Sequence, residues 1–397
     1  MNEVSRARWK LLGGIFLVII LIHIVIISCI ASGHRSAAAP AVTPAATSQD
    51  TPRVEPRTDN QTPAPAPKPP AEKKKSGGFW SRLFGGGKAN AVPEKKPEPV
   101  KPPHVWRFKK PSTNPMFGKP FDYSQAVRGD LPAKVVPHAQ ECRTGIMVDL
   151  DTRKVLWEKN SGKPVPIASM VKMMTLLLAF DGLEADSSVS LDTPVQISRQ
   201  VLKIPRTGVV WLDPRETLPL SDLMKAAAIK SANDAAIQIA LLFSHDNLDN
   251  FVTRMNAKAL ELGMTESRFV SPCGLPDKKK GNSVSSARDM VILGEHLLEY
   301  PQYLTWSSTK VDYIRSGNKK TMLNATNRLI NPHWPGVDGL KTGFTNDAGY
   351  CMTFSVLRDG RRIVGCVTGF PHASKGRDPF VRKLIDWGYK RAAQLGK

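Results

Sequence analysis

The stretch PIASMVKMMTLLLAF, Pro166 to Phe180, reads as a buried helix that carries two polar side chains near its start. Ser169 falls at the expected N-terminus of this helix, and Lys172 follows three residues later on the same face. Methionines and leucines crowd Lys172, and desolvation favours the neutral form of an amine. We therefore interpret Lys172 as a general base for the Ser169 hydroxyl, which is a poor nucleophile without one. The alternative is a lysine that reaches solvent from an ordinary amphipathic helix.

Two further short patterns follow along the chain. Ser231 and Asn233 form a Ser-x-Asn pattern between two predicted helices, where a hydroxyl and a carboxamide can project into a cleft. Lys341, Thr342 and Gly343 form a Lys-Thr-Gly pattern on a predicted strand. Each pattern alone is weak evidence, because similar ones recur elsewhere in the chain. Their order within the one region that reads as folded indicates a single site.

Residues 138–397 alternate between strand and helix patterns, so we assign them to one α+β domain. Hairpins are predicted over residues 143–160 and 350–368. Because strands lie at both ends of the domain and helices lie between them, we expect one sheet that is built from both ends. Cys351 and Cys366 share a face of the second hairpin and read as small core residues, since five cysteines indicate no disulfide framework.

The first 30 residues predict a membrane anchor. The run from Leu11 to Ile30 has 20 residues and no formal charge, which is long enough to cross a bilayer as a helix. Three basic residues precede it, so residues 1–10 should stay in the cytoplasm and the rest of the chain should be exported. A cleaved signal peptide or a lipoprotein acylated at Cys29 is the alternative.

Residues 31–137 predict a disordered linker that is rich in proline and lysine. Residues 34–103 hold 14 of the 32 prolines and little apolar content, a composition that cannot fold alone. Within them, FWSRLF at residues 79–84 fits one face of a short helix that would bind a membrane surface or a partner, and a disordered apolar patch is the alternative. No nucleic-acid-binding module accompanies the basic runs, so we predict no nucleic-acid partner.

From about residue 140 to about residue 392, the sequence resembles the serine D-alanyl-D-alanine carboxypeptidases among the low-molecular-weight penicillin-binding proteins. Besides the three patterns, the resemblance rests on KSANDAAIQIA, FVSPCGLPD, SARDM, NATNRL and PGVDGLKTGFTNDAGYCM, which occur in the family's order. It implies the DD-peptidase and β-lactamase fold, an antiparallel five-stranded sheet flanked by helices. It also implies peptidoglycan stem peptides as substrates, acylation by β-lactams, no metal or organic cofactor, and a single-pass protein of a bacterial inner membrane whose catalytic domain faces the periplasm.

The resemblance assigns the chemical steps to the first two patterns. Ser169 would attack the carbonyl between two D-alanines and form an acyl-enzyme, with Lys172 accepting its proton. Ser231 would relay a proton towards the leaving amine. Asn233 would hold Lys172 and the amide backbone of the substrate.

The third pattern would bind the substrate. The resemblance implies that Lys341 and Thr342 hold the terminal carboxylate, which needs a cation and a hydroxyl donor. The backbone N–H groups of Ser169 and Phe344 would form the oxyanion hole. We explain Gly343 by the space that a paired substrate strand requires.

Three alternatives to a carboxypeptidase stay open. A β-lactamase shares the fold and the patterns, but the Glu-x-x-x-Asn element of one class does not occur between Ser231 and Lys341. A DD-endopeptidase that cuts peptidoglycan cross-links would use the same residues. A non-catalytic scaffold that binds the wall would be served equally well by the anchor and the linker, although the intact motifs argue against it. The eight histidines form no HExxH, HxxEH or HxH cluster, which argues against a metallopeptidase.

Overall fold

The computed structural model describes residues 105–330 and 334–396, which lie in one compact unit. The predicted membrane span and the FWSRLF segment lie outside these residues. Within the described part of the chain, we find no helix that combines the length and the apolar character needed to cross a membrane.

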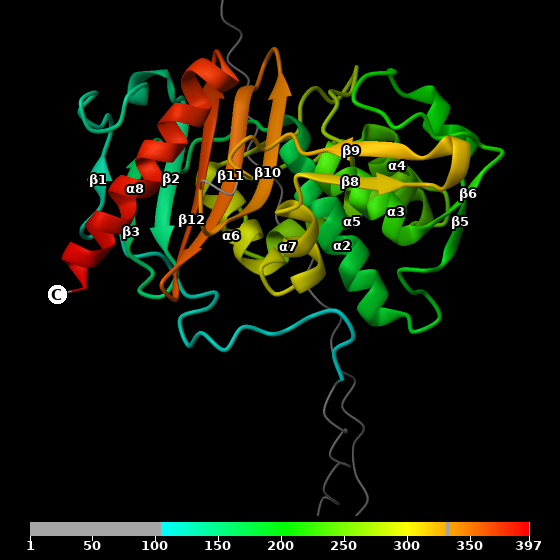
Figure 1. Ribbon diagram of the computed structural model, residues 1–397, viewed down its shortest axis with the longest axis horizontal. Helices are drawn as coiled ribbons and strands as arrows, with labels where there is room; N and C mark the ends of the chain where they lie inside the picture. Colours follow the sequence, from blue (N-terminus) through cyan, green and yellow to red (C-terminus); the bar gives the residue numbers. More distant parts are fainter. Residues whose placement is uncertain (1–104, 331–333, 397) are drawn as a thin grey trace, which may run out of the picture. The chain divides into compact units, whose positions relative to one another are not determined.

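A six-stranded sheet forms the centre of the unit, with strand order β1-β3-β2-β12-β11-β10 (Figure 1). Its strands are β1 (Val127–Arg128), β2 (Thr144–Asp149), β3 (Val155–Lys159), β10 (Val337–Thr345), β11 (Gly349–Arg358) and β12 (Arg361–Phe370). Three two-stranded pairs accompany it: β4 (Val165–Pro166) with β7 (Val284–Ser285), β5 (Pro194–Gln196) with β6 (Thr217–Pro219), and β8 (Val311–Ile314) with β9 (Thr321–Asn324).

Along the chain, most of the helices lie between strands β1 to β3 and strands β10 to β12. They are α2 (Lys172–Ala185), α3 (Leu220–Lys225), α4 (Asn233–Leu242), α5 (Leu248–Glu261), α6 (Ala287–Leu297), α7 (Pro301–Ser307) and α8 (Asp378–Leu395). Short 3-10 turns are η1 (Ala139–Glu141), η2 (Ala168–Val171), η3 (Arg199–Lys203) and η5 (Gly317–Lys319), and single π-helical turns are η4 (Ala226–Lys230) and η6 (Ala373–Arg377).

The expected count of five strands was wrong, because β1 adds a sixth. It pairs with β3 in parallel, with Val127 opposite Trp157, whereas the other neighbours in the sheet are antiparallel. The prediction missed β1 because its two residues lie in a stretch whose prolines and lysines were read as linker. The sheet is otherwise built from both ends of the domain, as predicted.

Helices cover both faces of the sheet, as predicted (Figure 1). Successive side chains of a strand point to opposite faces, so Met147 of β2 packs with Phe380 and Leu384 of α8, while Ile146 belongs to the core that contains α2, α4 and α6. The residues of α2 from Lys172 to Phe180 are all buried, which confirms the predicted buried helix.

The segment 105–137 packs against the domain, although it was assigned to the linker. The Glu184 carboxylate accepts hydrogen bonds from the backbone N–H groups of Phe108 and Lys109 at 2.6 and 2.7 Å. Leu131 and Val136 are buried. These few apolar side chains are diluted among prolines and lysines, so the average composition concealed them.

The second predicted hairpin is confirmed as β11 and β12, with Cys366 opposite Thr353. Four cysteines, Cys142, Cys273, Cys351 and Cys366, are buried and free in the described residues. Cys351 and Cys366 are therefore small core side chains, as predicted.

Candidate active site

Ser169 lies in the short turn η2, which leads directly into α2. Two glycines allow neighbouring segments to approach this turn closely. A Cβ on Gly343 would lie 2.7 Å from the Ile167 carbonyl oxygen, and a Cβ on Gly274 would overlap the Ala168 carbonyl oxygen. Contact of β10 with the serine turn therefore requires Gly343, whereas the space for a paired substrate strand stays a prediction.

Lys172 is fully buried, and its Nζ atom contacts three oxygen atoms. It lies 3.0 Å from Ser169 Oγ, and it donates hydrogen bonds to Asn233 Oδ1 at 2.7 Å and to the Cys273 carbonyl at 2.6 Å. Burial lowers the pKa of Lys172 to about 8, against the opposing electrostatic effects of Cys273 and Asp234. The Asn233 carboxamide oxygen and the Cys273 carbonyl have no proton to give. The Ser169 hydroxyl is therefore the one contact of the amine that can donate a proton to it.

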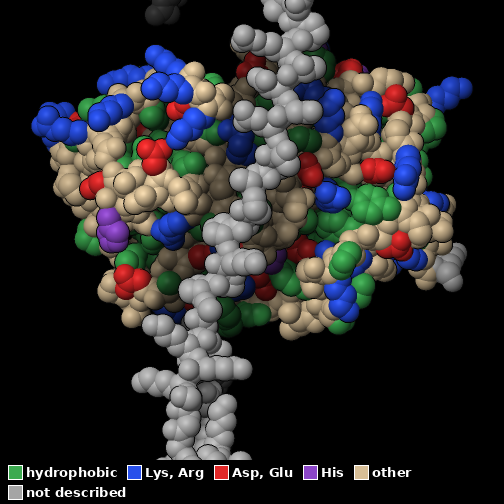
Figure 2. Space-filling model, turned by 180° about the vertical axis from the view of Figure 1, so that it is seen from behind, with side chains coloured by type: hydrophobic (Ala, Val, Ile, Leu, Met, Phe, Trp, Pro, Cys, Tyr) green, Lys and Arg blue, Asp and Glu red, His purple; other side chains and the backbone are tan. Residues whose placement is uncertain are grey.

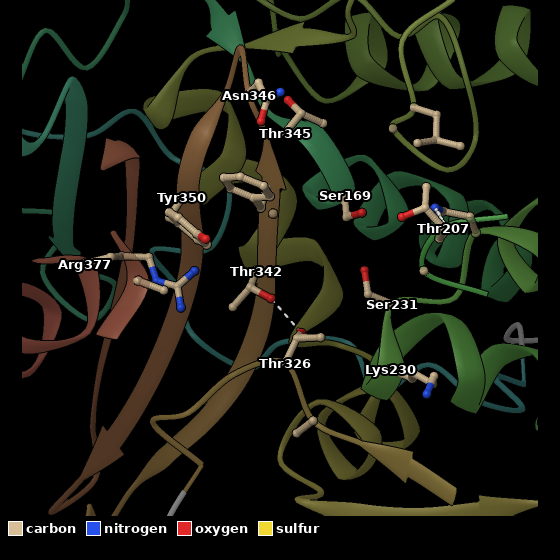
Figure 3. Close-up of a pocket in the computed structure, with 18 of the residues that line it drawn as sticks. Ser169, Thr207, Lys230, Ser231, Thr326, Thr342, Thr345, Asn346, Tyr350 and Arg377 are labelled. Carbon is tan, nitrogen blue, oxygen red and sulfur yellow. Dashed lines mark hydrogen bonds between the residues drawn. The ribbon is translucent and has the colours of Figure 1, made fainter. Parts of the chain in front are cut away.

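Ser231 directly follows η4, and Asn233 is the first residue of α4. Ser231 has a φ of 66°, in the left-handed region, and its buried Oγ has no hydrogen-bond partner among the described residues. Figure 3 shows its side chain and that of Ser169 beside the same space. The Asn233 amide Nδ2 donates to the Thr207 carbonyl at 2.7 Å, which orients its Oδ1 towards Lys172.

The strand β10 supplies the opposite wall. Thr342 and Phe344 face the cavity, where the Thr342 hydroxyl lies 2.6 Å from that of Thr326 and the half-exposed Phe344 ring stacks on Tyr350. Lys341 is not among the residues that line the cavity. It is buried and donates to the Thr342 carbonyl at 3.0 Å.

The pKa of Lys341 depends on the charge of Lys172. Burial lowers the pKa of Lys341 well below its ordinary value, and the positive charges of Lys172 and Arg377 lower it further. The described residues provide no carboxylate in an ion pair with either lysine. Both amines therefore favour the neutral form more than a surface lysine does.

A cavity of about 720 Å³ joins these elements. Of the predicted residues, six line its surface: Ser169, Ser231, Asn233, Thr342, Gly343 and Phe344. Lys172 and Lys341 lie beneath that surface. The structure thus gathers residues from three distant parts of the sequence, while the role of each stays a prediction.

Three features of the site were missed. Arg377, in η6, lines the cavity, and its buried guanidinium bonds to Asp378 Oδ1 and to the Cys351 carbonyl. The carbonyl groups of Thr207 and Cys273 are backbone acceptors, which no side-chain pattern indicates. For Arg377, the only signal was a basic residue shortly after the last strand.

Within residues 105–330 and 334–396, no group of three or more His, Cys, Asp or Glu side chains is placed to hold a metal ion.

Comparison with known proteins identifies the family of the chain. Residues 133–371 match the family model described as D-alanyl-D-alanine carboxypeptidase. D-alanyl-D-alanine carboxypeptidase DacF of Bacillus subtilis is 35% identical over 254 residues, which cover 64% of this chain and 63% of the relative. A D-alanyl-D-alanine endopeptidase of Pseudomonas aeruginosa is also 35% identical, over 57% of this chain and 72% of the relative. The chain thus spans somewhat under two thirds of the Bacillus protein.

A solved structure with the same fold is penicillin-binding protein D2 from Listeria monocytogenes in the cefotaxime-bound form. It shares 30% sequence identity with a TM-score of 0.56, and the match covers 63% of this chain and 97% of that protein.

Proposed function

The chain belongs to the D-alanyl-D-alanine carboxypeptidase family, and we propose that it removes the terminal D-alanine from peptidoglycan stem peptides through an acyl-enzyme on Ser169. The observation that carries this proposal is the pairing of Ser169 with a buried amine. Lys172 Nζ lies 3.0 Å from Ser169 Oγ, and its pKa of about 8 keeps an appreciable neutral fraction near neutral pH.

The first step is attack of Ser169 Oγ on the carbonyl carbon of the penultimate D-alanine, while Lys172 takes the hydroxyl proton. The negative charge that develops on the carbonyl oxygen is stabilised by the N–H groups of Ser169 and Phe344, and losing such a donor costs about 3 to 4 kcal/mol in the barrier. Ser231, whose hydroxyl has no partner in the described residues, is free to pass the proton to the leaving amine. The C–N bond then breaks, D-alanine leaves, and water hydrolyses the ester.

The terminal carboxylate needs a positive group at the leaving side. Thr342 and Arg377 line the cavity, so we assign contact with the carboxylate to them. Lys341 was predicted to hold the carboxylate as well. Because it lies beneath the cavity surface and donates to the Thr342 carbonyl, we assign it an electrostatic contribution instead.

β-Lactams should acylate the same serine. Attack of Ser169 on the lactam carbonyl opens the ring, so the leaving nitrogen stays tethered and the ester persists. The cefotaxime-bound form of the Listeria relative supports this expectation.

Endopeptidase activity is the second candidate function. The Pseudomonas relative is named an endopeptidase at the same identity as the Bacillus carboxypeptidase. Both reactions break an amide bond at a D-alanine carbonyl, so the same catalytic residues serve each.

We also propose that residues 11–30 anchor the protein in the inner membrane of a bacterium and that the linker carries the domain on the periplasmic side. The support is the uncharged run of 20 residues and the basic residues that precede it. Membrane fractionation of the full chain, beside a chain that lacks residues 11–30, tests this proposal. Equal release of the two into the soluble fraction would refute it.

The activity is tested by release of free D-alanine from a pentapeptide that ends in D-Ala-D-Ala. We expect the full chain to release it, Ser169→Ala to release none, and Ser188→Ala, at an exposed serine, to behave as the wild type. No release by a folded wild-type protein, together with cleavage of a cross-linked peptide dimer, would instead establish the endopeptidase. Activity on neither substrate would support a scaffold.

A further inference from the structure

Trp211 presents a large apolar ring to solvent. It is 62% exposed, the largest exposed fraction of any Phe, Tyr or Trp side chain in residues 105–330 and 334–396. Single exposed apolar side chains are common, and hydrophobic side chains lie among charged ones on the face shown in Figure 2. Exposure alone therefore assigns no ligand to Trp211, whereas its backbone sets it apart.

The backbone of Trp211 is held in an unfavourable conformation. Its φ of 58° lies in the left-handed region, where a bulky residue is a rare outlier. The buried Asp234 carboxylate accepts hydrogen bonds from the N–H groups of Val210 at 3.1 Å and Leu212 at 3.0 Å. The Arg315 guanidinium donates to the carbonyls of Val210 and Trp211 at 3.1 and 3.3 Å. Strain that the surroundings hold in place in this way is typical of ligand-binding positions.

The loop that carries this tryptophan also forms part of the cavity at Ser169. Thr207 and Gly208 line the cavity. Their carbonyls accept hydrogen bonds at 2.7 Å from the side-chain amide and from the backbone N–H of Asn233, respectively. Figure 3 shows Thr207 on the side of Ser169 that lies away from Thr342. A substrate bound at Ser169 therefore has this loop as one of its walls.

Trp211 lies within reach of the group to which a bound stem peptide is attached. It follows Gly208 by three residues, so the two Cα atoms are at most about 11 Å apart. A stem peptide of five residues extends at most about 18 Å. The bond that Ser169 attacks is at one end of this peptide, and the glycan strand of the peptidoglycan is at the other. The strand therefore comes close enough to the cavity to contact the ring.

The ring and its neighbours suit a sugar. The face of an aromatic ring is negative, so it stacks on the C–H bonds of a pyranose, which carry slight positive charge. The exposed Leu202 and Arg206 line one shallow groove with Trp211. The Arg206 guanidinium lies 5.4 Å from the centre of the indole ring, where its N–H groups can donate to the hydroxyl and acetamido oxygens of an amino sugar.

We propose that Trp211, flanked by Arg206, is a binding platform for a sugar ring of the glycan strand that carries the stem peptide. The proposal rests on the proposed function and specifies its substrate: stem peptides that are attached to glycan, in preference to free peptides. The platform positions the substrate and takes no part in bond breaking.

The test compares two substrates, a free pentapeptide ending in D-Ala-D-Ala and the same pentapeptide attached to a tetrasaccharide of the glycan strand. We expect the wild-type full chain to prefer the attached form about 2- to 10-fold in kcat/KM, a range typical of one aromatic contact. The difference should lie in KM, because the ring binds ground state and transition state alike. Trp211→Ala and Trp211→Leu should lose the preference, whereas Trp211→Tyr, which keeps an aromatic face, should retain most of it.

Trp106→Ala is the matched control. Trp106 is 43% exposed and has the Lys109 ammonium 5.0 Å from its ring centre, but it is not among the residues that line the cavity. It should keep the wild-type preference. Melting temperatures establish that each variant is folded.

Equal substrate ratios in the wild type and Trp211→Ala, with D-alanine still released, would overturn the platform and leave the proposed function intact. Equal ratios together with weaker binding of Trp211→Ala to phosphatidylglycerol vesicles would overturn it as well and assign the ring to a membrane surface. Absence of release from both substrates would count against the proposed function itself.

Discussion

Lys172 Nζ donates a hydrogen bond to Asn233 Oδ1 at 2.7 Å, although 61 residues separate the two in sequence. The carboxamide fixes the amine beside Ser169 without adding a negative charge. A carboxylate in its place would favour the ammonium form and raise the pKa of Lys172.

The variant Asn233→Asp is therefore expected to acylate more slowly at neutral pH. A neighbouring opposite charge shifts a pKa by roughly 1 to 3 units, so the rate of acylation by a fluorescent penicillin at pH 7 should fall about 10- to 1000-fold. The rate should recover as the pH rises. Asn250→Asp, at an exposed position on α5, should match the wild type. An unshifted pH midpoint in Asn233→Asp would show that Lys172 is not the base.

The wild-type pH profile has a defined direction. Burial lowers the pKa of Lys172 to about 8, and only the neutral amine accepts a proton. The acylation rate should thus rise about tenfold per pH unit below that value and level off above it. Stopped-flow acylation between pH 6 and pH 10 measures this profile. A rate that stays constant across the range would contradict the assignment.

Gly343→Ala should impair acylation more than its small size suggests. The added Cβ would lie 2.7 Å from the Ile167 carbonyl and 3.3 Å from the Ala168 Cβ, so either β10 or the serine turn must shift. Overpacking of this kind costs about 1 to 3 kcal/mol of stability. We expect a lower melting temperature and a clear loss of acylation rate.

Gly162→Ala serves as the control, because its Cβ would meet no atom nearer than 4.0 Å. Gly162→Ala should alter neither the melting temperature nor the acylation rate. If Gly343→Ala acylated at the wild-type rate, close contact of β10 with the serine turn would not be needed to hold Ser169.

Much of the domain could be predicted because its signals are local. The uninterrupted apolar run of α2 and the alternating strands of the β11 and β12 hairpin each follow from short-range periodicity. Ser169 and Ser231 could be assigned to one site only through the order of the motifs and the family resemblance, because they come to line the same cavity through packing of α2 against the segment before α4.

Other features depend on the folded chain alone. The Cys273 carbonyl that holds Lys172 belongs to a loop whose close approach requires Gly274. The inward position of Lys341 follows from its side of the strand, which the motif does not specify. The strand β1 has two residues, too few for any periodicity.

The packing of segment 105–137 leads to a prediction on stability. Lys109 forms an ion pair with Glu299 at 3.0 Å, and the Glu299 side chain is only 5% exposed. Removal of one partner from a largely buried pair costs about 3 to 5 kcal/mol, because the other charge stays desolvated. A chain that begins at residue 138 should therefore melt well below one that begins at residue 105.

Single substitutions distinguish the ion pair from the other contacts of the segment. Lys109→Ala in the longer chain should lower the melting temperature, whereas Lys134→Ala, at an exposed lysine of the same segment, should not. Lys109→Ala with Glu299→Gln should recover part of the loss, since the buried charge is removed with its partner. Equal melting temperatures for the two truncated chains would mean that the segment contacts the domain without stabilising it. The stable domain would then begin at residue 138, as the sequence predicted.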